Sequence, residues 1–175
     1  MAEGANAGVL IQPRDDWRLA SVLALRDRVP ALTDFAASQH GLALRDGPFR
    51  SVGFGVDAIG IGQHRWLFVR YGEDERFVAN LAHSLAGIAA VSDHSDGYAI
   101  FEVSGSRARQ MLAKGVPLDL HPQAFTVGDG AVTSIAHMGA ILWQLDAAPR
   151  YAIAVFRSYA DSFRDFLESS AAEFR

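Results

Sequence analysis

The sequence contains no cysteine among its 175 residues. Disulfides, thiolate zinc sites, iron–sulfur clusters and a cysteine nucleophile are therefore excluded, and the absence fits a reducing cytosol. No apolar run approaches the roughly 18 residues that a membrane span needs. The first eight residues have neither the basic nor the apolar region of a signal peptide. We therefore expect a cytoplasmic protein that does not enter a membrane.

Positive charge is scarce and scattered along the chain. There are 16 basic and 20 acidic residues, and the formal net charge is −4. The densest basic group is Arg107 with Arg109, so nucleic-acid binding has no electrostatic footprint. Both arginines fall in the first turn of an expected helix, where the helix dipole does not favour a cation. We interpret them as a solvated face, with an anion or an acidic partner as the alternative.

The residues that are present have the composition of a globular protein. Half are hydrophobic and 21% are charged, which is ordinary for such chains. At 175 residues, the length allows one domain or two small subdomains. A chain of this size buries about 68–70% of its unfolded surface, so it needs no disulfide or metal to fold.

The first half of the sequence predicts helices followed by glycine-rich strands. Asp15 or Asp16 can cap a helix whose apolar positions run from Trp17 to Leu25. A second helix is expected from Leu32 or Thr33 to His40, with Gly41 in the left-handed position that ends it. Further expected elements are short strands between residues 49 and 71, a helix opening at 72–74 with Phe77, Leu81 and Leu85 on one face, and a strand at 88–91.

The second half predicts a strand at 98–103, a helix from Ser104 that stops at Lys114 and Gly115, and an ordered loop over 116–130. Three antiparallel strands follow at 132–136, 139–145 and 151–156. A last helix begins at a capping box formed by Ser158 and Asp161. Its apolar face holds the aromatic side chains of Tyr159, Phe163, Phe166 and Phe174 together with Leu167.

This order of elements predicts an α+β fold with mostly antiparallel sheets, because no regular alternation of strand and helix is present. Residues 1–28 are expected to form a partly helical extension. Residues 29–175 are expected to form the main domain. The polar turn at 92–97 marks a division of that domain into two small α/β subdomains that share a core.

Two short motifs invite a chemical interpretation. Gly53, Gly55 and Ala58 match the dinucleotide pattern G-x-G-x-x-A, with Glu73 twenty residues after the first glycine. The pattern needs a preceding strand and a following helix, but strand alternation continues through Ile61, which favours bulged strands. Residues 93–96 (DHSD) hold three potential metal ligands within four positions, yet a turn that bonds its own backbone is the more frequent use of such residues.

The histidines and serines do not form a catalytic motif. No G-x-S-x-G elbow accompanies them. His83 falls on a helix and His137 ends a strand, and neither has a partner nearby in sequence, so we interpret both as structural. The residues by themselves therefore predict no catalytic, cofactor-binding or metal site.

Several segments form a set with a consistent order and spacing. The longest are VSDHSDG at 91–97, SGSRAR at 104–109 and LAKGVPLDLHPQAF at 112–125. Shorter ones are GLAL at 41–44, GQHRWL at 62–67, RSYA at 157–160 and AAEF at 171–174. Across about Val29 to Phe174, the set resembles the gamma subunit of heterotetrameric sarcosine oxidase.

This resemblance implies both a fold and a function. The fold would be similar to the N-terminal, folate-binding part of the glycine-cleavage T-protein, an aminomethyltransferase. The function would be that of a non-catalytic subunit assembled with alpha, beta and delta chains. Such complexes oxidise sarcosine to glycine and hydrogen peroxide, and the one-carbon unit leaves as formaldehyde or passes to tetrahydrofolate. FAD, FMN and NAD would be bound by alpha and beta and zinc by delta, with no cofactor in this chain.

One alternative stays open beside the subunit hypothesis. A T-protein-like chain can also be a stand-alone folate or one-carbon-binding protein. A folate site needs a carboxylate for the pterin and basic groups for the glutamyl tail, and the sequence identifies neither.

The segment 116–125 is the candidate interface of this chain. Its two prolines favour an ordered loop, in which Asp119 and His121 can bond the backbone. One hypothesis is that these residues only hold the loop. The other is that the loop presents anchors to the alpha subunit, because interface energy concentrates in a few buried side chains. The candidate residues are Leu118, Asp119, Leu120, His121 and Phe125.

Overall fold

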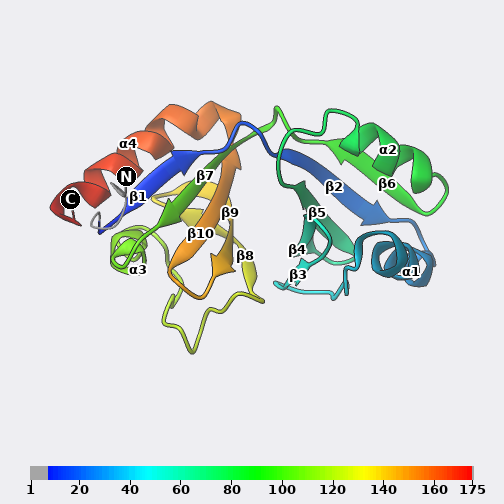
Figure 1. Ribbon diagram of the computed structural model, residues 1–175, viewed down its shortest axis with the longest axis horizontal. Coiled ribbons are helices and arrows are strands. Elements are labelled where there is room, and N and C mark those ends of the chain that lie inside the picture. The colour runs from blue at the N-terminus through cyan, green and yellow to red at the C-terminus, as the bar shows by residue number, and fades with distance from the viewer. Residues whose placement is uncertain (1–7, 175) are drawn as a thin grey trace, which may run out of the picture. The chain divides into compact units, whose positions relative to one another are not determined.

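The computed structural model describes residues 8–174, which divide into two compact units. The first unit consists of residues 8–15 and 98–174, and the second unit consists of residues 16–97. Each unit holds a five-stranded sheet whose paired strands are all antiparallel. Helices lie against each sheet (Figure 1). The predicted α+β class with antiparallel sheets is therefore confirmed. The expectation that the two subdomains share a core is wrong, because each unit has a hydrophobic core of its own.

The sheet of the first unit is built almost entirely from the C-terminal half of the chain. Its strand order is β1-β7-β10-β9-β8. The strands are β1 (Leu10–Pro13), β7 (Tyr98–Ser104), β8 (Gly130–Ile135), β9 (Met138–Asp146) and β10 (Arg150–Phe156). The last three were predicted to within two residues. Ala136 and His137 join β8 to β9 in a two-residue turn with positive φ at both positions, the geometry that suits the twist of a hairpin.

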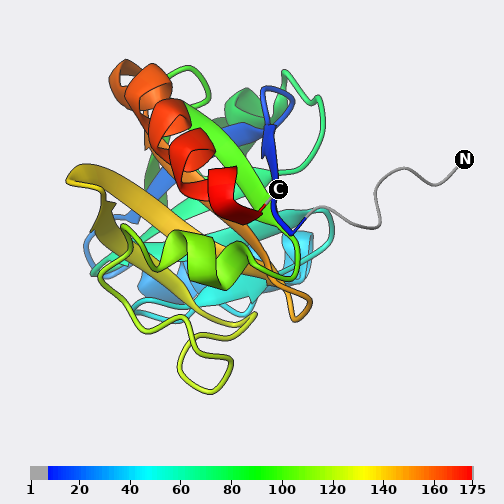
Figure 2. The ribbon, with the colours of Figure 1, turned by 90° about the vertical axis from the view of Figure 1, so that its left-hand side faces the viewer.

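Two helices pack on the sheet of the first unit, α3 (Ala108–Leu112) and α4 (Ala160–Ala171), the latter flanked by the 3₁₀ turns Arg157–Tyr159 and Ala172–Phe174. Phe163 and Leu167 of α4 are fully buried in the core of this unit together with Met111 of α3. Phe163 contacts Phe101 of β7 at a ring-centroid distance of 5.4 Å. Figure 2 shows α4 crossing the sheet on the side that faces the viewer.

The second unit has the strand order β3-β4-β5-β2-β6. Its elements are β2 (Arg18–Ala24), α1 (Val29–His40), β3 (Arg50–Val52), β4 (Val56–Gly62), β5 (Arg65–Arg70), α2 (Phe77–Ser84) and β6 (Ala89–Asp93). Leu32 and Ala36 of α1 pack with Phe77 and Leu81 of α2 in the core of this unit. As predicted, α1 ends at Gly41, whose φ of 68° is left-handed.

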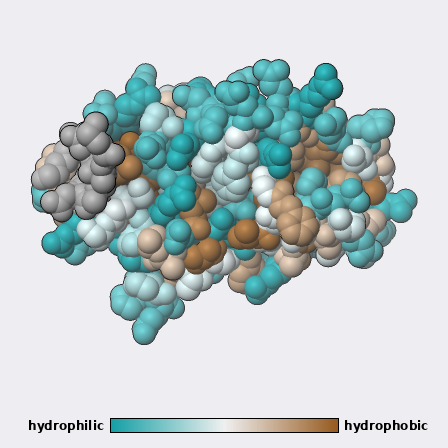
Figure 3. Space-filling view, viewed as in Figure 1, coloured by the Kyte–Doolittle hydropathy of each residue, from teal (hydrophilic) through white to brown (hydrophobic). Residues whose placement is uncertain are grey.

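One helix in each unit has a largely hydrophilic outer side. Figure 3 shows polar surface over α4 in one unit and over α2 in the other. No helix within residues 8–174 is long and apolar enough to cross a membrane.

The helix predicted from Asp15 or Asp16 is wrong, and the described part of the expected N-terminal extension holds strands β1 and β2 instead. β2 lies between β5 and β6 in the sheet. Leu19 and Ala20 are adjacent in sequence and both fully buried, so both faces of β2 are covered. A strand of this kind lacks apolar alternation, and its pattern cannot be told from that of a buried helix.

Two predicted helix ends are also wrong. The capping box at Ser158 and Asp161 does not form, because Tyr159 is the N-cap of α4 and no side chain caps it. α3 ends at Leu112, before Lys114 and Gly115. Lys114 instead donates a hydrogen bond to the Ser170 carbonyl at 2.8 Å and pairs with Glu173 at 2.6 Å, and so ties the end of α4 to this segment.

Candidate functional site

The loop between α3 and β8 contains all five candidate interface residues. Figures 1 and 2 both show part of it projecting away from the sheet of the first unit. The Asp119 carboxylate accepts a hydrogen bond from the backbone N–H of His121 at 2.8 Å. The His121 Nδ1 accepts one from the N–H of Gln123 at 3.3 Å. These are the local bonds that the sequence led us to expect of the two residues, and they order the turn.

Burial divides the candidate residues into two groups. Leu120 and Phe125 are 4% and 7% exposed and belong to the core of the first unit. The Phe125 ring lies 6.4 Å from the ring of Tyr151. Both side chains therefore hold the loop to its own unit and are not presented at the surface. Leu118, which is 37% exposed, and the exposed Asp119 and His121 are the candidates that face outward.

A pocket of about 270 Å³ lies in the second unit. Its lining comes from α1, α2, the ends of β4 and β5, and Asp74 in the segment between β5 and α2. The lining residues are Phe35, Gln39, His40, Val56, Arg70, Asp74, Phe77, Asn80, Leu81 and Ser84. Val56, Phe77 and Leu81 are buried, whereas Gln39, Asn80 and Ser84 are exposed. The pocket thus has an apolar floor and a polar rim, the usual composition of a small-molecule site.

His40 and Arg70 are the basic groups of this pocket. The imidazole of His40 lies edge-on between two aromatic rings, 5.7 Å from Phe35 and 6.4 Å from Phe68. Burial, and then the positive charge of Arg70, lower the pKa of His40 below its ordinary value of 6.5, so the ring is neutral near pH 7. Arg70 contacts the Asp74 carboxylate and the Gly55 carbonyl, each at 3.4 Å.

The glycines that resemble a dinucleotide motif lie close to two residues of this pocket, His40 and Arg70. They lie in the turn between β3 and β4. A Cβ at Gly53 would overlap the His40 carbonyl oxygen, and one at Gly55 would lie 2.7 Å from the Arg70 guanidinium. Gly55 also has a φ of 71°, which glycine adopts without strain. Because they have no Cβ, these glycines allow the turn to approach His40 and Arg70 closely.

The DHSD segment forms a turn, as the sequence favoured. The Asp93 carboxylate accepts a hydrogen bond from the Ser95 N–H at 2.9 Å, and His94 Nε2 lies 3.1 Å from the Ser21 hydroxyl. Within residues 8–174, no group of three His, Asp or Glu side chains is placed to hold a metal ion.

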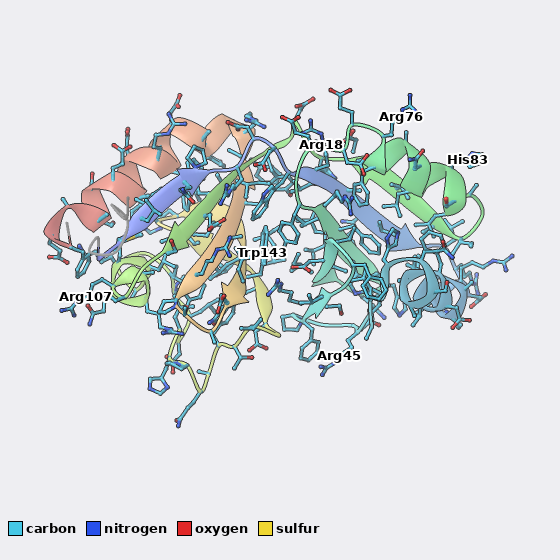
Figure 4. All side chains as sticks on the ribbon, viewed as in Figure 1. Arg18, Arg45, Arg76, His83, Arg107 and Trp143 are labelled. Atoms are coloured by element: carbon cyan, nitrogen blue, oxygen red, sulfur yellow. The ribbon has the colours of Figure 1, made fainter. Side chains whose placement is uncertain are left out.

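Arg107 and Arg109 have different environments. Arg107 is exposed, points away from α3 (Figure 4) and donates to Gln110 at 2.8 Å, as expected of a solvated face. Arg109 is not on that face, because its Nε is buried. Burial raises the pKa of Tyr151 above its ordinary value, and the nearby Arg109 offsets part of this rise.

Comparison with known proteins identifies the family. Residues 56–173 match the model of a protein family described as "Sarcosine oxidase, gamma subunit family". The chain is also 30% identical, over 149 residues, to the sarcosine oxidase gamma subunit of Corynebacterium sp. (strain P-1), covering 82% of this chain and 71% of that protein. The chain belongs to the sarcosine oxidase gamma subunit family. The gamma subunit from Arthrobacter sp. is 28% identical over the same shares of each chain.

Two solved structures share the fold of this gamma-family chain. One is a chain of the heterotetrameric sarcosine oxidase from Corynebacterium sp. U-96 in complex with pyrrole 2-carboxylate, with a TM-score of 0.83 at 21% identity over 95% of this chain and 85% of that one. The other is the glycine cleavage system aminomethyltransferase T from Bartonella henselae, with a TM-score of 0.70 at 13% identity over 94% of this chain and 46% of that one. The predicted T-protein-like fold is confirmed.

Sequence reasoning missed the pocket of the second unit. Its polar residues come from α1, β5, the segment between β5 and α2, and α2 itself, and no spacing along the chain brings them together. The one readable signal is the pair Arg70 and Asp74, four residues apart, which suggests a helical ion pair. Arg70 ends a strand instead, and the tertiary structure alone places both groups at one cavity.

Proposed function

We propose that this chain is the non-catalytic gamma subunit of a heterotetrameric, flavin-dependent sarcosine oxidase, with a structural role in assembly. The observation that carries the proposal is the family match over residues 56–173. The shared fold with a chain of a heterotetrameric sarcosine oxidase supports it.

On this proposal, the complete complex converts sarcosine, dioxygen and water to glycine, formaldehyde and hydrogen peroxide. The amine is oxidised by two electrons, dioxygen accepts them, and water supplies the oxygen of formaldehyde. Tetrahydrofolate can take the one-carbon unit in place of its release. FAD, FMN and NAD belong to the alpha and beta chains and zinc to the delta chain, while this chain contributes contact surface.

Co-expression tests the proposal directly. The chain should elute as one complex with its cognate alpha, beta and delta chains, and that complex should form peroxide from sarcosine. Failure to co-purify with cognate chains contradicts the assembly role. Saturable binding of tetrahydrofolate by the isolated chain, without association with any of the three, favours the stand-alone one-carbon protein instead.

The outward-facing part of the 116–125 loop is the proposed contact with the alpha chain. Leu118 is presented at the surface by a turn that Asp119 and His121 order, and its neighbour Leu120 anchors the turn in the core. A partly exposed leucine on an ordered loop loses little conformational entropy on binding, which favours its use as an anchor.

Leu118→Ala should weaken co-purification with the alpha chain about tenfold or more while leaving the unfolding midpoint of the isolated chain near wild type. Leu25→Ala is the matched control, since Leu25 is similarly exposed at 42% but lies in the second unit. Unchanged assembly of Leu118→Ala refutes this contact without touching the family assignment.

A further inference from the structure

The pocket of the second unit has a paired charge arrangement that the proposed assembly role does not use. Its lining residues with permanent charge are Arg70 and Asp74. Their closest atoms, the Arg70 Nε and an Asp74 carboxylate oxygen, are 3.4 Å apart. Charge-assisted N–H···O bonds are usually about 2.7–2.9 Å, so this pair is loosely joined.

The Arg70 guanidinium retains hydrogen-bonding capacity toward the cavity. It carries five N–H donors, and its other contact, to the Gly55 carbonyl, is also 3.4 Å long. The side chain of Arg70 is 36% exposed and that of Asp74 is 35% exposed. Both charges are therefore reachable by a ligand in the pocket, and neither is buried beneath it.

The floor beside these charges is apolar and partly aromatic. Phe77 and Leu81 of α2 and Val56 of β4 are 6%, 3% and 1% exposed, and Phe35 of α1 packs against the same core. The imidazole of His40, whose pKa is lowered by burial and by Arg70, is neutral near pH 7, so it adds a polar edge without a second positive charge. The cavity is thus electrically balanced, with one cation and one anion above an apolar surface.

A ligand of matching chemistry carries one negative charge, one positive charge and an apolar body. A simple anion would be attracted by Arg70 but repelled by Asp74. A simple cation would be attracted by Asp74 but repelled by Arg70. We propose that this pocket binds a zwitterionic amino acid with an apolar side chain, whose carboxylate pairs with Arg70, whose ammonium pairs with Asp74 and whose side chain lies on the Phe35, Phe77 and Leu81 surface.

The size of the pocket agrees with this class of ligand. Its 270 Å³ is slightly below the range of pockets that enclose drug-sized molecules. The exposed amides of Gln39 and Asn80 and the hydroxyl of Ser84 stand at the rim, where they can bond the ligand's remaining carboxylate or ammonium positions.

Isothermal titration calorimetry of the full isolated chain tests the proposal with three probes. The first is L-phenylalanine. The other two each lack one of its charged groups: 3-phenylpropanoate lacks the ammonium, and 2-phenylethylamine lacks the carboxylate. L-phenylalanine should bind saturably and about tenfold more tightly than either analogue. Glycine and sarcosine, which lack the apolar body, should bind more weakly than L-phenylalanine. The absence of saturable L-phenylalanine binding below ~10 mM, or equal binding of all three phenyl probes, overturns the proposal.

Variants assign the binding to this pocket. Arg70→Gln should weaken L-phenylalanine binding about tenfold, and Asp74→Asn should weaken it while leaving 3-phenylpropanoate binding unchanged or tighter. Arg76→Gln is the matched control, because Arg76 points away from α2 (Figure 4) and does not line the pocket. Unaltered binding by Arg70→Gln overturns the assignment. The probe comparison on the unmodified chain decides the ligand class even if a variant fails to fold.

Discussion

At the scale of single residues, the buried carboxylate of Glu102 in β7 is held between two arginines. Its side chain is 4% exposed and pairs with Arg14 at 2.7 Å and Arg150 at 2.6 Å. Burial acts to raise the pKa of Glu102, but the hydrogen bonds and charges of Arg150 and Arg14 outweigh it and lower the pKa below the ordinary 4.5. The group thus links β10 and the residue that follows β1 to β7, the strand that lies between β1 and β10.

Replacing this carboxylate should destabilise the first unit. Glu102→Gln should lower the free energy of unfolding by about 1–3 kcal/mol at pH 7. The loss is not larger because Arg14 and Arg150 are partly solvated, so leaving them unpaired costs less than leaving a buried charge unpaired. Equilibrium urea unfolding measures the change. Glu173→Gln is the control, since Glu173 forms an exposed pair, and it should cost less than 1 kcal/mol.

The same residue predicts a pH dependence with a definite sign. Because the folded pKa of Glu102 is lowered, its contribution is fully present above the unfolded value near 4.5 and is lost as pH falls through the folded value. The stability difference between wild type and Glu102→Gln should therefore shrink on acidification below pH 4.5. A difference that grows in acid contradicts the assigned ionisation.

At the scale of elements, close backbone approach decides where glycine is required. Gly60 lies within β4 and donates its N–H to the Phe49 carbonyl at 2.9 Å. A Cβ at Gly60 would overlap the backbone carbonyl of Gly47, whereas one at Gly62 would meet only the Arg65 Cβ at 3.9 Å. The two glycines share a strand and look alike in the sequence, but only the first is sterically needed.

Gly60→Ala should lower the free energy of unfolding by about 1–3 kcal/mol, because the turn carrying Gly47 must move. Gly62→Ala should stay within about 0.5 kcal/mol of wild type. Urea unfolding of both variants makes the comparison. Equal effects of the two substitutions would show that crowding at Gly47 is not the cause.

The aromatic face of α4 supports a second prediction at this scale. Phe163→Ala removes a fully buried ring that contacts Phe101 and should cost about 3–5 kcal/mol. Phe156→Ala is the control, since Phe156 is 51% exposed and stacks only on the surface with Tyr98 at 5.1 Å, and it should cost about 1 kcal/mol. Thermal and urea unfolding distinguish the two, and a loss of about 1 kcal/mol or less for Phe163→Ala contradicts the expected contribution of this buried ring.

At the scale of the whole molecule, the proposed function predicts a division of labour between chains. The chain purified alone should show no stoichiometric flavin absorbance and no peroxide formation from sarcosine, because the reaction chemistry resides in the partner chains on this proposal. A visible spectrum and a peroxide assay check this. Flavin bound stoichiometrically by the isolated chain contradicts the non-catalytic role.

The sequence by itself determined the fold class, the family and most elements. Strong local signals made this possible: Gly41 at the end of α1, the turn-forming Asp119, and Phe163 with Leu167 on the buried face of α4. Tyr159, which was expected on the same face, is 43% exposed and lies before α4. Each of these signals acts within a few residues of its own position, so a single stretch of sequence contains the whole signal. The family resemblance likewise rests on contiguous segments.

Only the tertiary structure decided the features that depend on residues far apart in the chain. β2 is a strand because β5 and β6 pair with its backbone on both sides, and this pairing outweighs a local pattern that resembles a helix. Leu120 and Phe125 look like exposed loop anchors in the sequence, but the core of the first unit takes them in. Arg70 and His40 face one pocket only because a strand end and a helix end converge there.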